Sequence, residues 1–124
     1  MTGRNVVGWF EIYVKDMERA KKFYEAVFQS SLEQIQMEGM EMWMFPGDPN
    51  NAGCPGALVK MDGMEPSGTN TIVYFTSKDC SVEEKRVVEH GGKVHTPKMS
   101  IGEHGFITMA VDTEGNMIGI HSLK

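Results

Sequence analysis

The order of elements predicted for the first half of the chain returns in the second half, and this repeat restricts the fold most. Each half reads as a strand, a helix and three further strands. Val14–Asp16 aligns with Ser77–Asp79, an offset of about 63 residues, and the later strands keep the same order. We therefore predict an internal duplication of one βαβββ unit.

Hydrophobic spacing and turn residues set the bounds of the predicted elements. Asp16 and Asp79 each precede a helical pattern and are suited to capping it, and Gly91-Gly92 ends the second helix. The first half is predicted to hold a strand at 6–14, a helix at 17–28 and strands near 31–37, 40–46 and 56–61. The second is predicted to hold a strand at 69–77, a helix near 80–90 and strands near 93–99, 104–111 and 116–121. Residues 64–68 are predicted to link the halves, and the turn-rich stretch 47–51 is predicted to be a loop.

Alternation along the first strand predicts two different faces. Successive side chains on a strand point to opposite sides, so Phe10, Ile12 and Val14 form one apolar face. This face should pack on the helix that follows. Trp9, Glu11 and Tyr13 form the other face, which we expect to line the concave wall of a cup.

Composition excludes several classes of function. The formal net charge is -5 and the sequence pI is about 5.3, which argues against nucleic acid and anionic membranes as partners. Cys54 and Cys80 are too few for a disulfide framework, so we expect free thiols in the cytosol. No apolar run is long enough for a transmembrane helix, and the first residues lack the apolar stretch of a signal peptide. Eleven methionines are typical of gap-filling in a core or of an adaptable pocket.

The segment from Trp9 to Phe28 resembles the opening of proteins of the vicinal oxygen chelate superfamily, with a strand, an acidic turn and a helix that carries a Phe-Tyr pair. Asp112-Thr113-Glu114-Gly115-Asn116 resembles the turn that leads into the last strand of that family, with Thr113 in place of the usual proline. The superfamily includes glyoxalase I, bleomycin-resistance proteins and extradiol dioxygenases. The resemblance implies an α+β fold, with two βαβββ modules forming a cup-shaped eight-stranded sheet and helices on its outer face. We predict one domain over residues 1–124, with module one at about 6–62 and module two at about 69–122.

The resemblance also implies positions for a divalent metal, which other members bind with His and Glu. These positions fall on Trp9, near Ala57, on Val73 and on Gly119. None of these side chains binds a hard or borderline cation. We therefore predict no cofactor and no metal at the usual site, with a rebuilt divalent site from Glu11, His121 and a third group as the alternative.

Glu11 is the most informative polar residue because it interrupts an apolar strand, and burying a lone carboxylate is costly. We interpret it as a polar anchor or a general base, with a carboxylate at a solvated rim or paired with a neighbour as the alternative. Glu103 and His104 are candidates for gating the site, and His90 is expected to be structural at a helix end. The predicted substrate-binding residues are Trp9, Glu11, Tyr13, Val73, Phe75 and His121, with Glu11 as the catalytic candidate.

Three functions stay open from the sequence. The first is a metal-free protein that binds a small organic molecule, as in the bleomycin-resistance branch. The second is a lyase or isomerase, or a dioxygenase-like enzyme, that uses Glu11 as a base or a non-standard metal. The third is a structural or regulatory dimer with a vestigial cup. We expect a cytoplasmic homodimer, because open module edges favour pairing and the superfamily commonly pairs modules across two chains.

Overall fold

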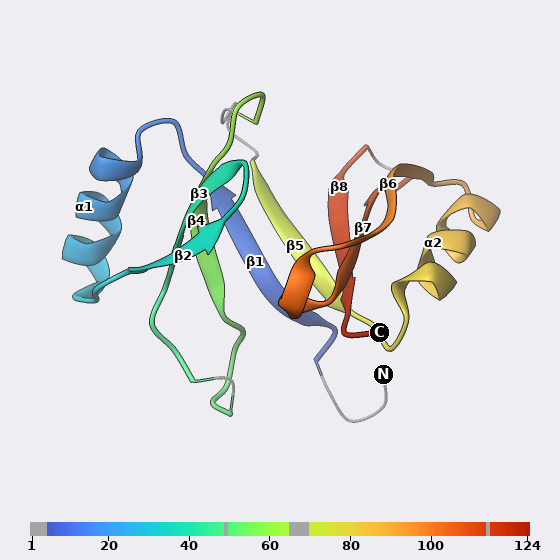
Figure 1. Ribbon diagram of the computed structural model, residues 1–124, viewed down its shortest axis with the longest axis horizontal. Helices are drawn as coiled ribbons and strands as arrows, with labels where there is room; N and C mark the ends of the chain where they lie inside the picture. The colour runs from blue at the N-terminus through green and yellow to red at the C-terminus, as the bar shows by residue number, and fades with distance from the viewer. Residues whose placement is uncertain (1–4, 49, 65–69, 114) are drawn as a thin grey trace. The chain divides into compact units, whose positions relative to one another are not determined.

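A computed structural model of the chain describes residues 5–48, 50–64, 70–113 and 115–124 (Figure 1). The chain forms two compact units, and each is described by itself. Residues 9–71 form one unit, which we call module one. Residues 72–124 form the other, module two, together with the residues up to Gly8. Residues 65–68 of the predicted linker at 64–68 lie outside the described residues. The same holds for Thr69 of the predicted strand 69–77.

Module one contains the first five elements of the chain. The first two residues of β1, Val7 and Gly8, belong to the other unit. They are β1 (Val7–Tyr13), α1 (Met17–Phe28), β2 (Glu33–Met37), β3 (Met40–Met44) and β4 (Gly56–Lys60). The strand order is β2-β3-β4-β1, with β4 parallel to β1 and the other neighbours antiparallel. The hairpin between β2 and β3 turns through Gly39, whose φ of 77° suits a residue without a Cβ.

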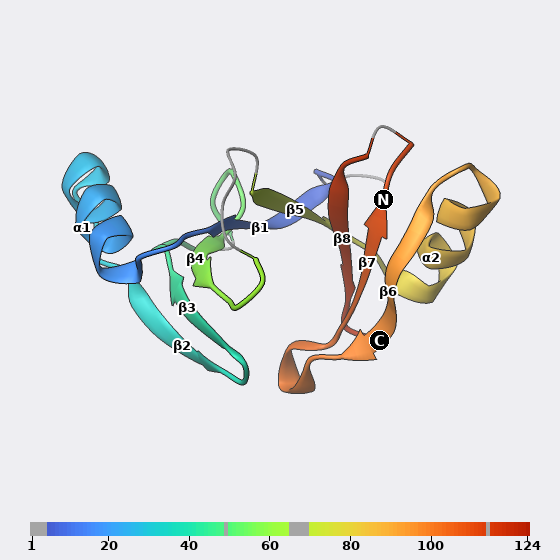
Figure 2. The ribbon, with the colours of Figure 1, turned by 90° about the horizontal axis from the view of Figure 1, so that it is seen from above.

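Module two repeats this order with one added turn. Its elements are β5 (Thr71–Thr76), α2 (Cys80–Glu89), β6 (Lys93–Ser100), the 3-10 turn η1 (Gly102–His104), β7 (Phe106–Val111) and β8 (Met117–Ser122). The strand order is β5-β8-β7-β6, with β8 parallel to β5. Figure 2 shows α2 beside β6, the element that it contacts most extensively.

The predicted fold class is confirmed: the described residues form an α+β fold of two βαβββ modules with eight strands and two helices. The observed bounds lie within a few residues of the predicted ones. The strand predicted from residue 104 begins only at Phe106, because η1 and Gly105, with a φ of 105°, turn the chain first. Neither helix in the described parts of the chain is long and apolar enough to cross a membrane.

The core of module one joins α1 to its sheet. Val14, Met17, Leu32 and Leu58 are buried together, with Ile12, Ala20, Tyr24, Trp43 and Phe45 packed against them. This confirms that the apolar side of β1 faces the helix. Asp16 caps α1 as predicted, since its Oδ1 accepts a hydrogen bond from Arg19 N at 3.1 Å.

The start of α2 is fixed by an ion pair as well as by a cap. Asp79 Oδ1 accepts hydrogen bonds from Ser81 N at 3.0 Å and from Lys98 Nζ at 2.9 Å, so β6 is tied to the helix start. Cys80 follows, fully buried, and its N–H donates to Ser122 Oγ at 3.0 Å. The hydrogen bond from Lys98, joined by those from Ser81, holds the pKa of Asp79 well below its ordinary value of 3.8, and Asp79 raises the pKa of Lys98.

Leu58→Ala should destabilise the protein by about 2–5 kcal/mol, because it removes a fully buried side chain from the centre of the module one core. Chemical denaturation measures the loss. Leu123→Ala is the matched control, since Leu123 is 78% exposed, and should change the free energy of unfolding by less than about 0.5 kcal/mol. Equal effects of the two substitutions would contradict the described core.

Lys98→Gln should raise the pKa of Asp79 toward 3.8, because it removes the largest cause of the lowering. A carboxyl whose pKa is lowered on folding contributes stability above its unfolded pKa and loses it as the pH falls through the folded value. The wild type should therefore lose stability below pH 3.8 more steeply than Lys98→Gln does. NMR titration of Asp79 and denaturation against pH test this, with Lys60→Gln as the control. An unchanged Asp79 titration in Lys98→Gln would refute the ion pair.

Candidate functional site

Glu11 is a buried carboxylate held by two ring donors on its own strand. It is 7% exposed. Trp9 Nε1 donates to Oε2 at 3.0 Å, and Tyr13 Oη donates to Oε1 at 2.8 Å. Alternation places these three side chains on one side of β1, opposite Ile12 and Val14, which pack toward α1. The structure thus brings together the three site residues predicted in module one.

The strands beside β1 extend this side of the sheet with apolar side chains, of which Met42, Ala57 and Val59 are buried. Ala57 lies next to Glu11, and Val59 next to Tyr13, in the parallel β1–β4 register. Met44 and Met42 follow across β4, and Met40 and Met37 form a cross-strand pair at the end of the β2–β3 hairpin. We call this surface the Glu11 face; it comprises Trp9, Glu11, Tyr13, Glu33, Ile35, Met37, Met40, Met42, Met44, Ala57 and Val59.

A second Trp–Glu pair lies on the opposite side of the same sheet. Trp43 Nε1 donates to Glu41 Oε2 at 2.9 Å, also across two residues of one strand. Lys21 Nζ of α1 lies 3.3 Å from the centroid of the Trp43 ring, and Lys60 is the strand neighbour of Glu41. This pair belongs to the helix side, so it offers an internal control for the first.

The predicted site residues of module two do not share a face. Thr108 Oγ1 donates to Glu84 Oε1 of α2 at 2.6 Å, which assigns the Thr108 side of the sheet to the helix. Through the strand register, Ile120 and Phe75 lie on that same side, and Val73 shares it by alternation. His121 lies on the other side, with Thr76 as its neighbour. Ile72, Tyr74 and Thr76 lie on the side of β5 away from the helix, where Ile72 and Tyr74 are buried.

His121 is tied to the turn before β7. Its Nε2 donates to the carbonyl oxygen of His104 at 2.6 Å, so the ring orients η1. Glu103 and His104, the predicted gating pair, both lie in η1, with 3.9 Å between His104 Nε2 and Glu103 Oε1. His90 is the C-cap residue of α2, as its predicted structural role requires, and its N–H donates to Arg86 O at 3.0 Å.

The residues at the family's metal positions do not fit a metal ion. Trp9 and Ala57 carry no suitable donor, and Val73 lies on the helix side of its sheet. A Cβ on Gly119 would lie 2.3 Å from the Tyr74 ring, so that ring fills the space a ligand side chain needs. Among the described residues, no three His, Cys, Asp or Glu side chains gather as metal ligands. The metal-free site itself stays a prediction.

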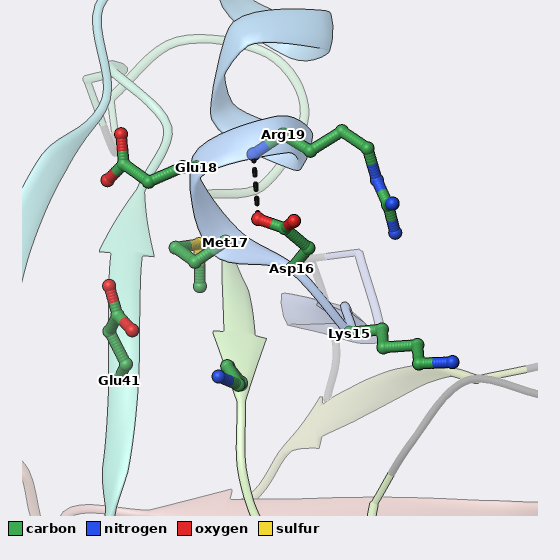
Figure 3. Close-up of a pocket in the computed structure, with 7 residues that line it drawn as sticks. Lys15, Asp16, Met17, Glu18, Arg19 and Glu41 are labelled. Carbon is green, nitrogen blue, oxygen red and sulfur yellow. Dashed lines mark hydrogen bonds between the residues drawn. The ribbon is translucent and has the colours of Figure 1, made fainter.

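A polar cavity of about 560 Å³ lies at the start of α1, lined by Lys15–Arg19, Glu41 and Lys60 (Figure 3). Figure 3 shows the Glu18 and Glu41 carboxylates on one side of the helix start, whereas Lys15 and Arg19 extend away on the other. The charges therefore do not converge on one point. The Asp16 carboxylate already serves as the helix cap.

An apolar cavity of about 580 Å³ lies near the end of α1, on the same side of the sheet as the helix. Phe10, Tyr24 and Phe45 supply aromatic walls, with ring centroids 5.8 Å apart for Phe10–Phe45 and 5.7 Å for Tyr24–Phe45. The half-buried thiol of Cys54 lies in the loop that closes it. The sequence predicted only a loop in this region, at 47–51. A Cβ on Gly56 would lie 2.3 Å from the Phe10 ring, so this glycine leaves room for one aromatic wall of the cavity.

Residues 6–120 match the family described as the Glyoxalase/Bleomycin resistance protein/Dioxygenase superfamily, and the chain belongs to this family. This confirms the resemblance found in the sequence.

Individual relatives agree with this assignment. The chain is 28% identical, over 116 residues, to the protein named Putative glyoxylase CFP32 from Mycobacterium tuberculosis. The match covers 90% of this chain and 43% of that protein, so the chain spans less than half of the relative's length.

Two solved structures show the same fold. Methylmalonyl-CoA epimerase from Mycobacterium tuberculosis has a TM-score of 0.69 at 13% identity, covering 100% of this chain and 93% of that one. The hypothetical protein BH1468 from Bacillus halodurans has a TM-score of 0.72 at 10% identity, covering 95% and 94%. At these identities the likeness concerns the fold alone.

Glu11→Gln should move the indole N–H resonance of Trp9 and leave that of Trp43 in place. The substitution exchanges a charged acceptor for a neutral amide, and charge-assisted hydrogen bonds are the stronger ones. The chain has two tryptophans, so a ¹H–¹⁵N spectrum resolves both indoles. Glu41→Gln should give the opposite pattern, through the bond that Trp43 makes. An unchanged Trp9 indole N–H resonance in Glu11→Gln would contradict the site geometry.

Proposed function

We propose that this protein binds a small organic molecule on the Glu11 face and that Glu11 is its polar anchor. The observation that carries the proposal is a carboxylate, 7% exposed, fixed by hydrogen bonds from Trp9 and Tyr13 amid apolar side chains. Small-molecule sites typically combine apolar and aromatic walls with a few well-placed polar groups. Membership of the Glyoxalase/Bleomycin resistance protein/Dioxygenase superfamily supports the same function.

The methionines of the Glu11 face support binding more than rigid packing. Met37, Met40, Met42 and Met44 lie on this face by register. Methionine is flexible and polarizable, so a surface of this kind adjusts to the shape of what it contacts. This favours a binding function over a vestigial surface in a purely structural protein.

An enzyme is the second candidate, a lyase or isomerase with Glu11 as base. What favours it is the fixed position of the carboxylate, since a general base must be held within hydrogen-bond reach of the proton it takes. The names of the relatives, a glyoxylase and an epimerase, point the same way. We further propose that the protein acts in the cytosol as a homodimer, without a metal at the family's usual positions.

A screen of small organic molecules should find compounds that raise the melting temperature and shift the Trp9 indole resonance more than that of Trp43. The reason is that Trp9 shares hydrogen bonding with the proposed anchor, whereas Trp43 lies on the helix side. Glu11→Gln should abolish the stabilisation, and Glu41→Gln should preserve it. Conversion of a bound compound, lost in Glu11→Gln, would establish the enzyme instead.

Binding at the apolar cavity beside α1 is the outcome that would contradict this site. Its compounds would protect Cys54 from a thiol reagent and leave Trp9 unshifted. Cys80 is fully buried, so labelling of the native protein should report on Cys54.

A further inference from the structure

The side of α1 that faces away from its sheet carries apolar side chains in its second half. Phe23, Ala26 and Val27 are exposed there, Phe23 by 58% and Val27 by 54%. Their spacing places them on one stripe of the helix, which we call the outer stripe. Met17 and Tyr24 mark the opposite side, which packs on the sheet. The core of module one therefore does not account for the apolar character of the outer stripe.

The second helix provides an internal comparison. At the 63-residue offset of the repeat, the three positions of the outer stripe are occupied by exposed polar side chains: Arg86, Glu89 and His90, the C-cap residue. The exposed side of a helix in a globular protein is usually polar, and α2 follows this rule. Two copies of one unit thus differ at the same place, which indicates that the outer stripe of α1 meets a further surface.

The charges of α1 indicate which surface this is. Arg19 and Lys22 are exposed one turn before the outer stripe and on the same side of the helix. The last turn of α1 contains no basic residue, although the negative end of the helix dipole favours a cation there. A second α1 that runs antiparallel would bring its Arg19 and Lys22 toward that end while the two apolar stripes meet. The complementarity is reciprocal, because the same helix provides both ends.

We propose that the outer stripe of α1 is the surface through which two copies of this chain associate. The inference rests on the proposed homodimer, whose contact surface it names, and it does not depend on the ligand proposed for the Glu11 face. A two-fold axis perpendicular to α1 makes the helix and its copy antiparallel, as the charges favour. In this arrangement Phe23 of one copy packs against Ala26 of the other, and a large side chain opposite a small one lets the helices interdigitate.

The size of the outer stripe sets the expected strength of the dimer. A standard protein interface buries about 800 Å² on each partner, and one side of a 12-residue helix offers less than this. Interfaces at the small end of the range belong to weak or transient complexes. We therefore expect a dimer that dissociates within the micromolar concentration range, so that substitutions in the stripe change a measurable equilibrium.

Phe23→Asp should raise the dissociation constant of the dimer by about tenfold or more, because it places a carboxylate in the apolar contact of both copies. Val27→Asp should act in the same direction. Sedimentation equilibrium measures the constant, and circular dichroism verifies that each variant is folded. Val88→Asp is the matched control, since Val88 is 60% exposed on α2 and the substitution adds the same charge. It should leave the dissociation constant unchanged.

Cross-linking tests the position of the contact while its aromatic side chains stay in place. Ala26→Cys lies at the centre of the outer stripe, so a short bismaleimide should join two copies into a covalent dimer on a denaturing gel. Glu89→Cys is the counterpart in α2 at the 63-residue offset and should not be joined in this way. The wild type reports any background from Cys54, whose thiol is half-buried.

The outcomes separate the surface from the homodimer. A dimer that survives Phe23→Asp and Val27→Asp, without cross-linking at residue 26, would overturn the α1 interface and leave the homodimer standing. A wild type that stays monomeric across the concentration range would overturn both. An equal loss of dimer in Val88→Asp would assign the effect to charge alone and would also overturn the interface. Ligand binding at the Glu11 face is followed separately through the Trp9 indole resonance.

Discussion

The packing of α1 on one side of its sheet determines where every other feature of module one lies. Leu58 and Val14 are buried against Met17 of the helix, and Ile12 packs beside them. Burying an aliphatic side chain of this size contributes about 1.5–3 kcal/mol. A slip of β1 by one residue would exchange these side chains for Glu11 and its neighbours, placing a carboxylate beneath the helix. The apolar core therefore fixes the register, and the register places Glu11 on the side of the sheet opposite the helix.

The two Trp–Glu pairs show how one local arrangement acquires two roles. Both join an indole N–H to a carboxylate two residues away on the same strand. On the helix side, the pair has cationic neighbours, with Lys21 above the Trp43 ring and Lys60 beside Glu41. On the other side, Glu11 accepts hydrogen bonds from the rings of Trp9 and Tyr13. The same motif is thus part of a structural network on one side and of a candidate anchor on the other.

Sequence patterns predicted the fold well because capping residues and hydrophobic periodicity mark the helices and strands. Asp16 and Asp79 marked the helix starts, and the single charge in β1 identified which side of the strand faces away from the core. In β5 no charge interrupts the apolar run, so alternation could not say which side meets α2. Val73 and Phe75 were accordingly grouped with His121, although they lie on the other side of the sheet. The repeat could have assigned the sides of β5, since the 63-residue offset pairs Glu11 with Tyr74 and so places Tyr74 on the side away from the helix.

The Tyr74 ring fills the space beside Gly119, the residue of β8 that corresponds to a metal-ligand position of the family. It occupies the space where a side chain at position 119 would begin, so a histidine there would have to displace a buried aromatic ring. Trp9, at the matching position of β1, is likewise engaged with Glu11. Restoring donors at these two positions would break a packing contact and a hydrogen bond. The neighbouring side chains are therefore in conflict with donors at these two positions, and the buried polar group of the first strand is Glu11.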